Sequence, residues 1–227
     1  MHPQSPSATP VSHRPPYHRL LWSGLLSPLI VTVSIIGESL TRPSVNPVQE
    51  SISLLIEGSQ GRVLRIALVL GGALMLVYAW GLHLLKRHPA SVVKGQAAIG
   101  IGLATSGLFI QQGLAPRRGF RVPSPWGYLT AVGLIHVIGG LILYLAIVDS
   151  CFAVARHGPR HRPGGRWAHR YSLASGIVML GLLALFVLTA AIGGPSGLME
   201  RLVALVAILW EVWLVVGSVR HAYQQPA

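Results

Sequence analysis

Long apolar runs alternate with short polar stretches along the chain, and this alternation predicts the class of fold. Six runs each reach the roughly 20 residues that a helix needs to cross a bilayer. They cover residues 20–40, 63–85, 96–115, 126–155, 171–192 and 198–219. The pattern therefore predicts an all-α, polytopic membrane protein built as a six-helix transmembrane bundle.

The polar ends of the chain set the expected domain limits. Residues 1–19 are rich in Pro, Ser and His and are expected to form a disordered cytoplasmic tail. Residues 20–220 are expected to form the six-span transmembrane domain, and residues 221–227 a short C-terminal tail. The first apolar run lacks a small-residue cleavage site, so it is expected to remain as an uncleaved span.

A short amphipathic stretch lies between the first two runs at residues 46–58, and we call it the lid segment. Asn46 is a favoured helix N-cap, Pro47 suits the first helical position, and Gln49 stands where a capping box places Glu or Gln. Gly58 is suited to end a helix. The apolar positions fall on one helical face, which predicts a short helix lying over one end of the bundle.

Composition supports the membrane class and argues against a nucleic-acid partner. The 227 residues are 52% hydrophobic and only 11% charged, whereas soluble domains carry about 25% charged residues. The net charge of +12 comes from Lys and Arg placed between apolar runs. Multi-pass proteins collect basic residues in this way, and no single basic stripe with interleaved aromatic residues is present.

The Lys and Arg residues also predict an orientation in the cell membrane. Eleven of them fall on the side that holds both chain ends, and seven fall on the side of the lid segment. The positive-inside rule therefore places both termini in the cytoplasm and makes the lid segment extracytoplasmic. A basic cluster at residues 117–121 runs against this assignment, because it lies on the predicted outer side.

Four polar residues inside the apolar runs form a candidate intramembrane site. Glu211 lies far from either end of the sixth run, where an acid usually faces the bundle interior and marks function. His136 lies near the middle of the fourth run, with Thr130 and Tyr144 on its side of the helix. Each also has a structural reading: Glu211 as a protonated or hydrogen-bonded residue that fixes helix register, and His136 as a residue hydrogen-bonded across helices.

A second candidate site is the lid segment with the mouth of the bundle around it. Its members are polar or charged residues of the predicted outer side: Asn46, Glu50, Ser51, Ser53, Glu57, Gln111, Gln112, Glu200 and Arg201. Glu38 and the arginines at 117, 118 and 121 lie near them. The charges form either a mixed-charge mouth or an ordinary solvated rim, and exposed ion pairs need no function to explain them.

Other residues are expected to have structural roles. Asp149 is expected to pair with Arg156, and Cys151, the single cysteine, to be a small packing residue. Ala98, Gly102 and Ser106 recur every four residues, which predicts a close approach of two helices. No Walker loop, GxSxG motif or zinc-ligand spacing is present, so neither a cofactor nor a metal is expected.

Several stretches together resemble the membrane family called domain of unknown function 998. They are NPVQESIS after the first run, Thr130–Gly133–His136, and GLMERLVALVAILWEVWL in the sixth run. The family comprises bacterial and archaeal proteins with about six spans, and the resemblance covers roughly residues 20–220. It implies that the family pattern falls on Asn46, Pro47, Ser51, Ser53, His136, Gly197, Glu200 and Arg201.

One departure from that family pattern affects the lid segment. The family usually has an acidic residue followed by Leu-Gly after the second Ser, whereas Leu54 and Leu55 follow Ser53 here. If that acid coordinates something in relatives, this chain has lost it or uses Glu50 or Glu57. Glu211 lies outside the pattern, and the family implies no activity.

Three functions remain open on this evidence. The first is a bundle that binds a lipid or amphipathic small molecule in a transport-like role, with membrane lipids around it. The second is a structural subunit of a larger membrane complex, with a membrane-protein partner or a second copy. The third is an enzyme acting on a lipid or isoprenoid, in which Glu211, or Glu50 with His136, serves as general acid or base.

Overall fold

The structure is a computed structural model that describes residues 17–110, 130–158 and 165–224. Its described residues form helices and no strands, which confirms a helical membrane bundle. The elements are α1 (Tyr17–Thr41), the 3₁₀ helix η1 (Ile52–Ile56), α2 (Arg62–Leu85), α3 (Ala90–Leu108), α4 (Ala131–His157), α5 (Gly165–Ile192) and α6 (Ser196–Gln224).

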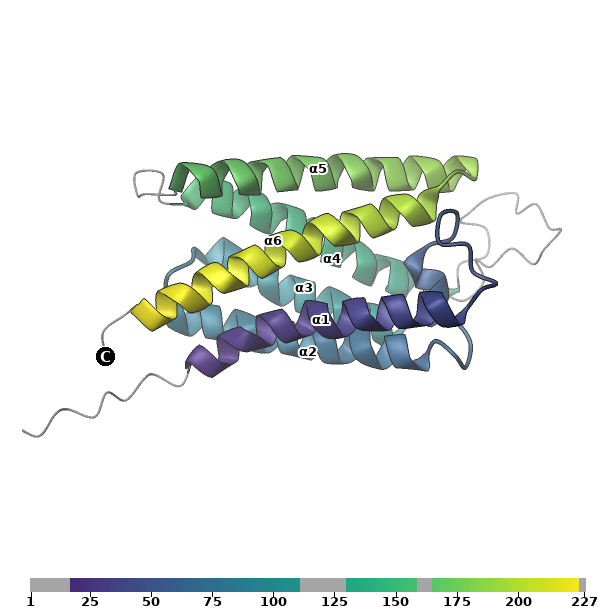
Figure 1. Ribbon diagram of the computed structural model, residues 1–227, viewed down its shortest axis with the longest axis horizontal. Coiled ribbons are helices and arrows are strands. Elements are labelled where there is room, and N and C mark those ends of the chain that lie inside the picture. The colour runs from purple at the N-terminus through teal and green to yellow at the C-terminus, as the bar shows by residue number, and fades with distance from the viewer. Residues whose placement is uncertain (1–16, 111–129, 159–164, 225–227) are drawn as a thin grey trace, which may run out of the picture.

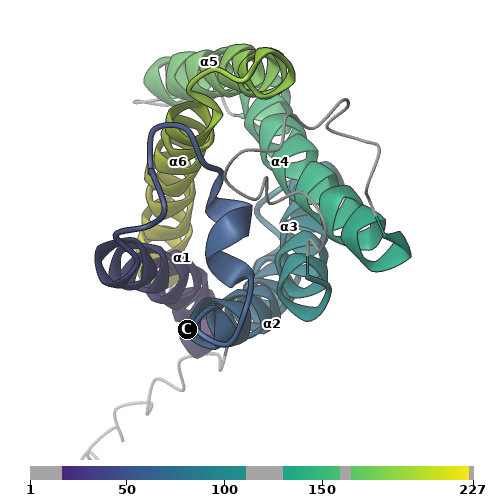
Figure 2. The ribbon, with the colours of Figure 1, turned by 90° about the vertical axis from the view of Figure 1, so that its right-hand side faces the viewer.

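The six α-helices form a closed ring in chain order (Figure 2). Each helix packs against the next, and α6 closes the ring by packing against α1. Figure 1 shows the helices running side by side along the long axis of the molecule. The short connections between α2 and α3 and between α5 and α6 make these sequence neighbours into antiparallel spatial neighbours.

Five of the six helices are long and apolar enough to cross a membrane, and α3 is the exception. Its 19 residues include Lys94 and Gln96, which lower its mean hydropathy. It begins after Pro89, six residues before the start predicted from the apolar run at 96–115, and ends at Leu108. Because α2 and α4 pack against it on either side, a less apolar helix is accommodated within the ring.

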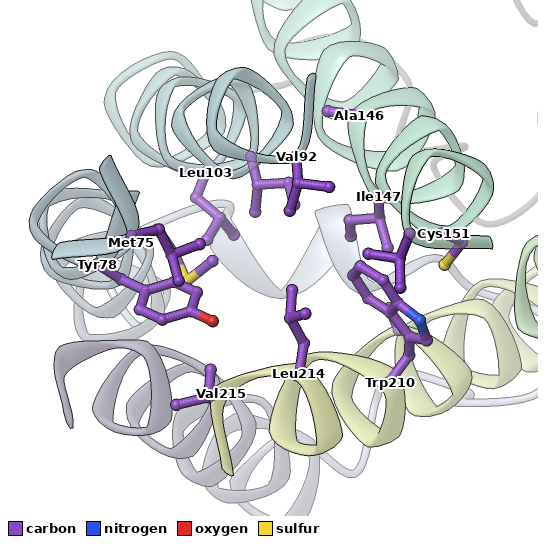
Figure 3. Packing of buried hydrophobic residues seen from close by; sticks show 14 of the residues in the cluster. Met75, Tyr78, Val92, Leu103, Ala146, Ile147, Cys151, Trp210, Leu214 and Val215 are labelled. Atoms are coloured by element: carbon purple, nitrogen blue, oxygen red, sulfur yellow. The ribbon is translucent and has the colours of Figure 1, made fainter. Parts of the chain in front are cut away.

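A hydrophobic core fills the middle of the ring. Figure 3 shows Tyr78, Leu103, Ile147, Trp210 and Leu214 pointing inward from α2, α3, α4 and α6. The outward faces of the helices carry large exposed apolar side chains, including Leu29, Val33, Trp80, Ile177 and Val187. A surface of this kind suits lipid, and the protein is a multi-pass membrane protein.

The predicted close helix approach occurs between α3 and α4. A Cβ atom placed on Gly102 would lie 2.7 Å from the Gly139 carbonyl oxygen, so no larger residue fits there. Two other structural predictions are also confirmed. Cys151 is fully buried, and Asp149 pairs with Arg156 at 3.5 Å on the exposed side of α4.

The lid segment is not the single helix that its sequence predicted. It folds as a turn at residues 47–49 followed by η1. Asn46 does cap the turn, because its Oδ1 accepts a hydrogen bond from the Val48 N–H at 3.0 Å. The reciprocal partner is Glu50 instead of Gln49: Glu50 Oε2 accepts from the Asn46 N–H at 2.9 Å.

Arg201 of α6 stabilises this break in the lid segment. A continuous α-helix would use the carbonyl groups of Pro47 and Glu50 for its own hydrogen bonds four residues on. Arg201 Nη1 instead donates to both carbonyl oxygens, at 2.8 Å and 2.9 Å. As predicted, the segment lies over one end of the bundle, where η1 covers the middle of the ring (Figure 2).

Candidate functional site

The start of α6 holds the first half of the lid segment. The Glu200 carboxylate accepts a hydrogen bond from the Ile52 N–H at 2.6 Å, at the first residue of η1. The Ser196 hydroxyl donates to the Gln49 carbonyl at 2.9 Å, and the Leu198 N–H donates to the Val48 carbonyl at 2.9 Å. The first N–H groups of a helix have no partner within that helix. Here the lid segment and α6 supply hydrogen-bond acceptors for each other's first N–H groups.

Gly197 allows this close contact because it has no side chain. A Cβ atom at Gly197 would overlap the backbone of Glu50. Arg201 Nη1 also donates to the Gly197 carbonyl oxygen at 3.1 Å, which joins the same backbone to the lid segment. The Gly-x-x-Glu-Arg stretch of α6 is therefore a docking surface for residues 47–52.

His136 of α4 holds the middle of the lid segment. Its Nδ1 lies 2.9 Å from the carbonyl oxygens of both Ser106 and Phe109, so Nδ1 carries the proton and donates. The other nitrogen, Nε2, then accepts from the Ser53 hydroxyl at 3.1 Å. The His136 side chain is only 5% exposed, and both of its ring nitrogens are hydrogen-bonded. It therefore connects the end of α3 to η1.

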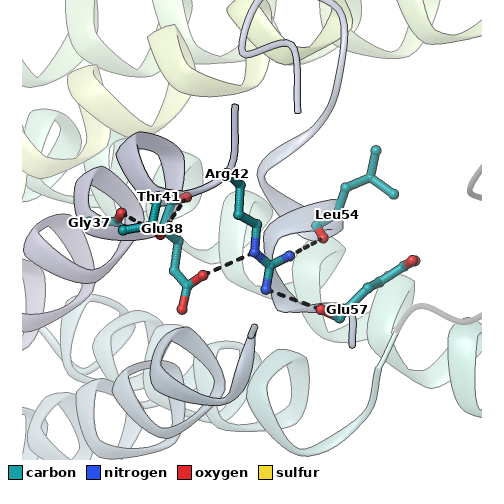
Figure 4. A network of polar contacts seen from close by, with 6 residues as sticks. All are labelled: Gly37, Glu38, Thr41, Arg42, Leu54 and Glu57. Atoms are coloured by element: carbon teal, nitrogen blue, oxygen red, sulfur yellow. Dashed lines mark hydrogen bonds and ion pairs between the residues drawn. The ribbon is translucent and has the colours of Figure 1, made fainter. Parts of the chain in front are cut away.

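Arg42, just after α1, holds the far end of the lid segment (Figure 4). Its Nε lies 3.2 Å from Glu38 Oε2, and both side chains are less than a tenth exposed. Its two terminal nitrogens donate to the Leu54 and Glu57 carbonyl oxygens at 3.4 Å and 3.2 Å. Glu38 is thus half of a buried ion pair, and the solvated-rim reading was wrong for this residue.

Glu57, at the end of η1, is half-buried. Burial raises the pKa of its carboxyl group, and the nearby Arg42 guanidinium works against that rise. Its carbonyl oxygen is the group that Arg42 binds, and its Oε1 has no hydrogen-bond partner. Ser51 precedes η1 as its N-cap residue without a capping hydrogen bond from its side chain.

A second polar cluster lies deeper in the ring around Glu211. The Gln96 amide of α3 donates from Nε2 to Glu211 Oε1 at 3.0 Å. Gln96 is fully buried and Glu211 is 5% exposed, so both groups are shielded from solvent. Their second oxygen atoms, Gln96 Oε1 and Glu211 Oε2, have no hydrogen-bond partner.

Two further buried hydroxyl groups make no well-formed hydrogen bond, although one of them, that of Tyr78, lies close to the Ser218 side chain. They belong to Tyr78 of α2 and Ser150 of α4. Tyr78 and Cys151 both interact electrostatically with Glu211. Buried polar atoms in proteins nearly always have partners, so several orphans in one region of the ring mark it as a candidate binding site. We call Glu211, Gln96 and Tyr78 the central cluster.

The tryptophans beside Glu211 have different surroundings. Trp210 is fully buried, and its Nε1–H donates to the Ser172 hydroxyl of α5 at 3.1 Å. Trp213 meets the rings of Trp167 and Tyr171 edge-on, at centroid distances of 5.8 Å and 5.2 Å. Trp210 therefore belongs to the core beside the central cluster, and Trp213 belongs to the contact between α5 and α6.

The candidate intramembrane residues fall in separate places. Thr130 is exposed and caps the start of α4, where its hydroxyl accepts from the Gly133 N–H at 3.0 Å. The Tyr144 hydroxyl approaches the Glu200 carboxylate closely enough to donate a hydrogen bond. His136 binds the lid segment, and only Glu211 lies in the central cluster.

His136 and Glu211 also differ in depth within the ring. Both α4 and α6 begin at the lid end. With a rise of about 1.5 Å per residue, His136 lies roughly 8 Å along its helix and Glu211 roughly 20 Å along its own. No hydrogen bond joins them in the described residues. The arrangement that would favour a catalytic acid–base pair, with both groups on one pocket, is therefore not found there. Gln111, Gln112 and the arginines at 117, 118 and 121 lie outside the described residues.

Gln96 is the functional candidate that the sequence pattern missed. The apolar run was taken to start at residue 96, which placed Gln96 at the membrane edge. The helix in fact starts at Ala90, so Gln96 lies nearly two turns inside it. The sequence did contain a signal for this earlier helix start. Pro89 is suited to the start of a helix, and the long side chain of exposed Lys94 can reach solvent from a position near a helix end.

Comparison with known families decides the family membership. A family model described as "Protein of unknown function (DUF998)" matches residues 25–217. The chain belongs to this family. No curated protein and no solved structure matches the chain. The residues that carried the DUF998 resemblance converge at the lid segment: Asn46, Pro47, Ser53, His136, Gly197, Glu200 and Arg201. In this chain their contacts dock the lid segment onto α4 and α6.

Proposed function

We propose that this DUF998 protein binds a lipid or amphipathic small molecule inside its helical ring, in a transport-like role in the cell membrane. The central cluster carries the proposal. Its unpartnered polar atoms lie among apolar side chains, where a polar atom without a hydrogen bond is costly. The polar head of an amphipathic ligand would form hydrogen bonds with these polar atoms, and its apolar body would pack against the apolar side chains.

The lid segment supports the same function. A transport-like protein needs a site that is covered from one side of the membrane and can be uncovered. The lid segment covers one mouth of the ring, and polar contacts from α1, α4 and α6 hold it there. Hydrogen bonds of this kind break and form again without unfolding the six helices. The lid segment is therefore the gate in this proposal.

Binding is tested by native mass spectrometry of the protein released from mild detergent. The wild type is compared with Glu211→Leu and Tyr78→Phe, which remove polar atoms of the central cluster. Asp149→Asn is the matched control, because Asp149 is an exposed acid on the outside of α4. We expect a discrete added mass on the wild type and the control, reduced at least tenfold in both cluster variants. Bare polypeptide in all samples would contradict ligand binding and favour a structural subunit instead.

The orientation is part of the proposal and has its own test. Both termini are placed in the cytoplasm and the lid segment outside, as the distribution of Lys and Arg indicates. Cys151 is the single cysteine and is fully buried, so a new surface cysteine is labelled without background. We expect Ser59→Cys to react with a membrane-impermeant maleimide in intact cells, and Gln224→Cys to react only after permeabilisation. The reverse pattern would overturn the orientation.

A further inference from the structure

The bond between Gln96 and Glu211 leaves a mismatch of donors and acceptors. Gln96 Nε2 donates to Glu211 Oε1, and the remaining atoms, Gln96 Oε1 and Glu211 Oε2, are both oxygens without a donor. An ionised carboxylate accepts hydrogen bonds only, and so does an amide oxygen. With Glu211 ionised, this pair therefore buries two unsatisfied acceptors and a negative charge.

Within the part of the chain that the structure describes, the groups around Glu211 supply no compensating positive charge. Tyr78 of α2 and Cys151 of α4 interact with it electrostatically, and both are neutral or negative. On α5, Ser172 binds Trp210 and Tyr171 lies near Cys151. The α1 residue packed between Tyr78 and Val215 of α6 is Gly24. The ion pairs Glu38–Arg42 and Asp149–Arg156 are formed elsewhere.

We propose that Glu211 and Gln96 form a proton-binding site inside the ring. Glu211 holds a proton on Oε2 and donates it to Gln96 Oε1, while Gln96 Nε2 donates to Glu211 Oε1. One proton thereby removes the buried charge and satisfies both oxygens, because a carboxylic acid and a carboxamide pair through two hydrogen bonds. An isolated buried carboxylate usually neutralises in this way. This pairing describes the ring without a ligand, and the polar head of a bound ligand would replace its second hydrogen bond. The proposal therefore does not rest on ligand binding by the ring.

Infrared spectroscopy of the purified protein near neutral pH tests the proton directly. A neutral carboxylic acid has a C=O stretching band that is well separated from the carboxylate bands and shifts in deuterium oxide. The chain has six acidic residues, so a single band can be assigned. We expect one such band to disappear in Glu211→Gln, which keeps the shape of the side chain. Glu38→Gln is the control and keeps the band, because Glu38 belongs to the ion pair with Arg42 and makes no contact with Glu211 among the described residues.

Two further variants make the test specific. Glu200→Gln also keeps the band, which separates Glu211 from the other buried acid of α6. Gln96→Leu moves the band, because the neutral acid loses the amide as its hydrogen-bond partner. A wild type without the band, or a band that survives Glu211→Gln, would overturn the proton site and indicate that a hydroxyl such as that of Tyr78 satisfies an ionised Glu211. A band unchanged by Gln96→Leu would overturn the pairing.

Discussion

The His136 imidazole and the Ser53 hydroxyl lie 3.1 Å apart, although 83 residues separate them in the chain. This bond joins α4 to η1 at the mouth of the ring. Since His136 Nδ1 already donates to the end of α3, the imidazole fixes the lid segment relative to two helices. The structure thus makes the lid segment a docked element with separate anchors, each of which can be removed alone.

Removing the Ser53 hydroxyl is expected to loosen the lid segment while leaving the ring intact. Ser53→Ala deletes one part-buried hydrogen bond, worth about 1 kcal/mol, and leaves His136 Nε2 without its donor. We expect hydrogen exchange of residues 52–57 to accelerate about fivefold, with the exchange of α2 and α6 unchanged. Hydrogen-exchange mass spectrometry in detergent measures this. Ser59→Ala, at an exposed position, is the control, and equal exchange in both variants would count against the anchor.

A side chain at Gly197 is expected to displace the lid segment. Gly197→Ala places a methyl group on the Glu50 backbone, and overpacking of this kind costs about 1–3 kcal/mol. Gly181→Ala is the matched control, because a Cβ atom there meets nothing within 4 Å and alanine favours a helix. Thermal unfolding followed by a thiol-reactive dye at buried Cys151 should give a lower melting temperature for Gly197→Ala only. A melting temperature equal to that of the control would show that the lid segment docks differently.

Breaking the buried ion pair is expected to destabilise the protein more than removing both partners. Arg42→Met leaves Glu38 buried and unpaired and removes the donors to the Leu54 and Glu57 carbonyls, for a loss of about 3 kcal/mol. The double variant Glu38→Leu with Arg42→Met should recover part of that loss, because no uncompensated charge remains. Melting temperatures of the two single variants and the double variant measure the coupling. Strictly additive effects would mean that the two charges do not interact.

Acid is expected to weaken the protein through His88, which lies in the connection between α2 and α3. Burial lowers the pKa of His88 to about 4, and the nearby Arg87 and His221 lower it further. The Nε2 atom of the His88 imidazole lies 2.9 Å from the Ser218 hydroxyl, within hydrogen-bond distance. In the unfolded chain the pKa is about 6.5, so the unfolded state takes up the proton first as the pH falls. The stability is therefore full above about pH 6.5 and declines toward pH 4, by at most about 3 kcal/mol.

The variant His88→Gln isolates this contribution. Glutamine keeps a hydrogen-bonding group opposite Ser218 but does not titrate in this range. We expect the melting temperature of the wild type to fall more steeply than that of the variant between neutral pH and about pH 5. If the melting temperatures of the two proteins fall in parallel as the pH is lowered, groups other than His88 cause the acid sensitivity.

Local features of the chain explain what could be predicted from the sequence. The apolar runs predicted the helices, because burial in lipid requires length and hydropathy that a single segment shows by itself. Asn46 was identified as a cap for the same reason, since its bond to the Val48 N–H spans two residues. The position of the lid segment at one end of the ring followed from its place between two spans.

The candidate sites were less predictable because their partners are distant in the chain. Glu211 was found from its position in an apolar run, but its partner Gln96 lies 115 residues away and at a helix start that hydropathy misplaced. The sequence left Glu38 open between a mixed-charge mouth and a solvated rim, because it does not show that the Leu54 and Glu57 carbonyls fold back over Arg42. Thr130 was predicted to share the helical side of His136, but it is an exposed residue just before α4, where its hydroxyl caps the helix.

By itself the sequence determined the membrane class, the helical fold, the existence of a lid segment and the isolation of Glu211 among apolar residues. All of these depend on the composition and order of neighbouring residues. Only the tertiary structure decided that the ring closes through α1 and α6, that Arg201 interrupts a helix in the lid segment, and that Glu211 meets Gln96. These features depend on which helices pack together, and packing is a property of pairs of segments that neither segment carries alone.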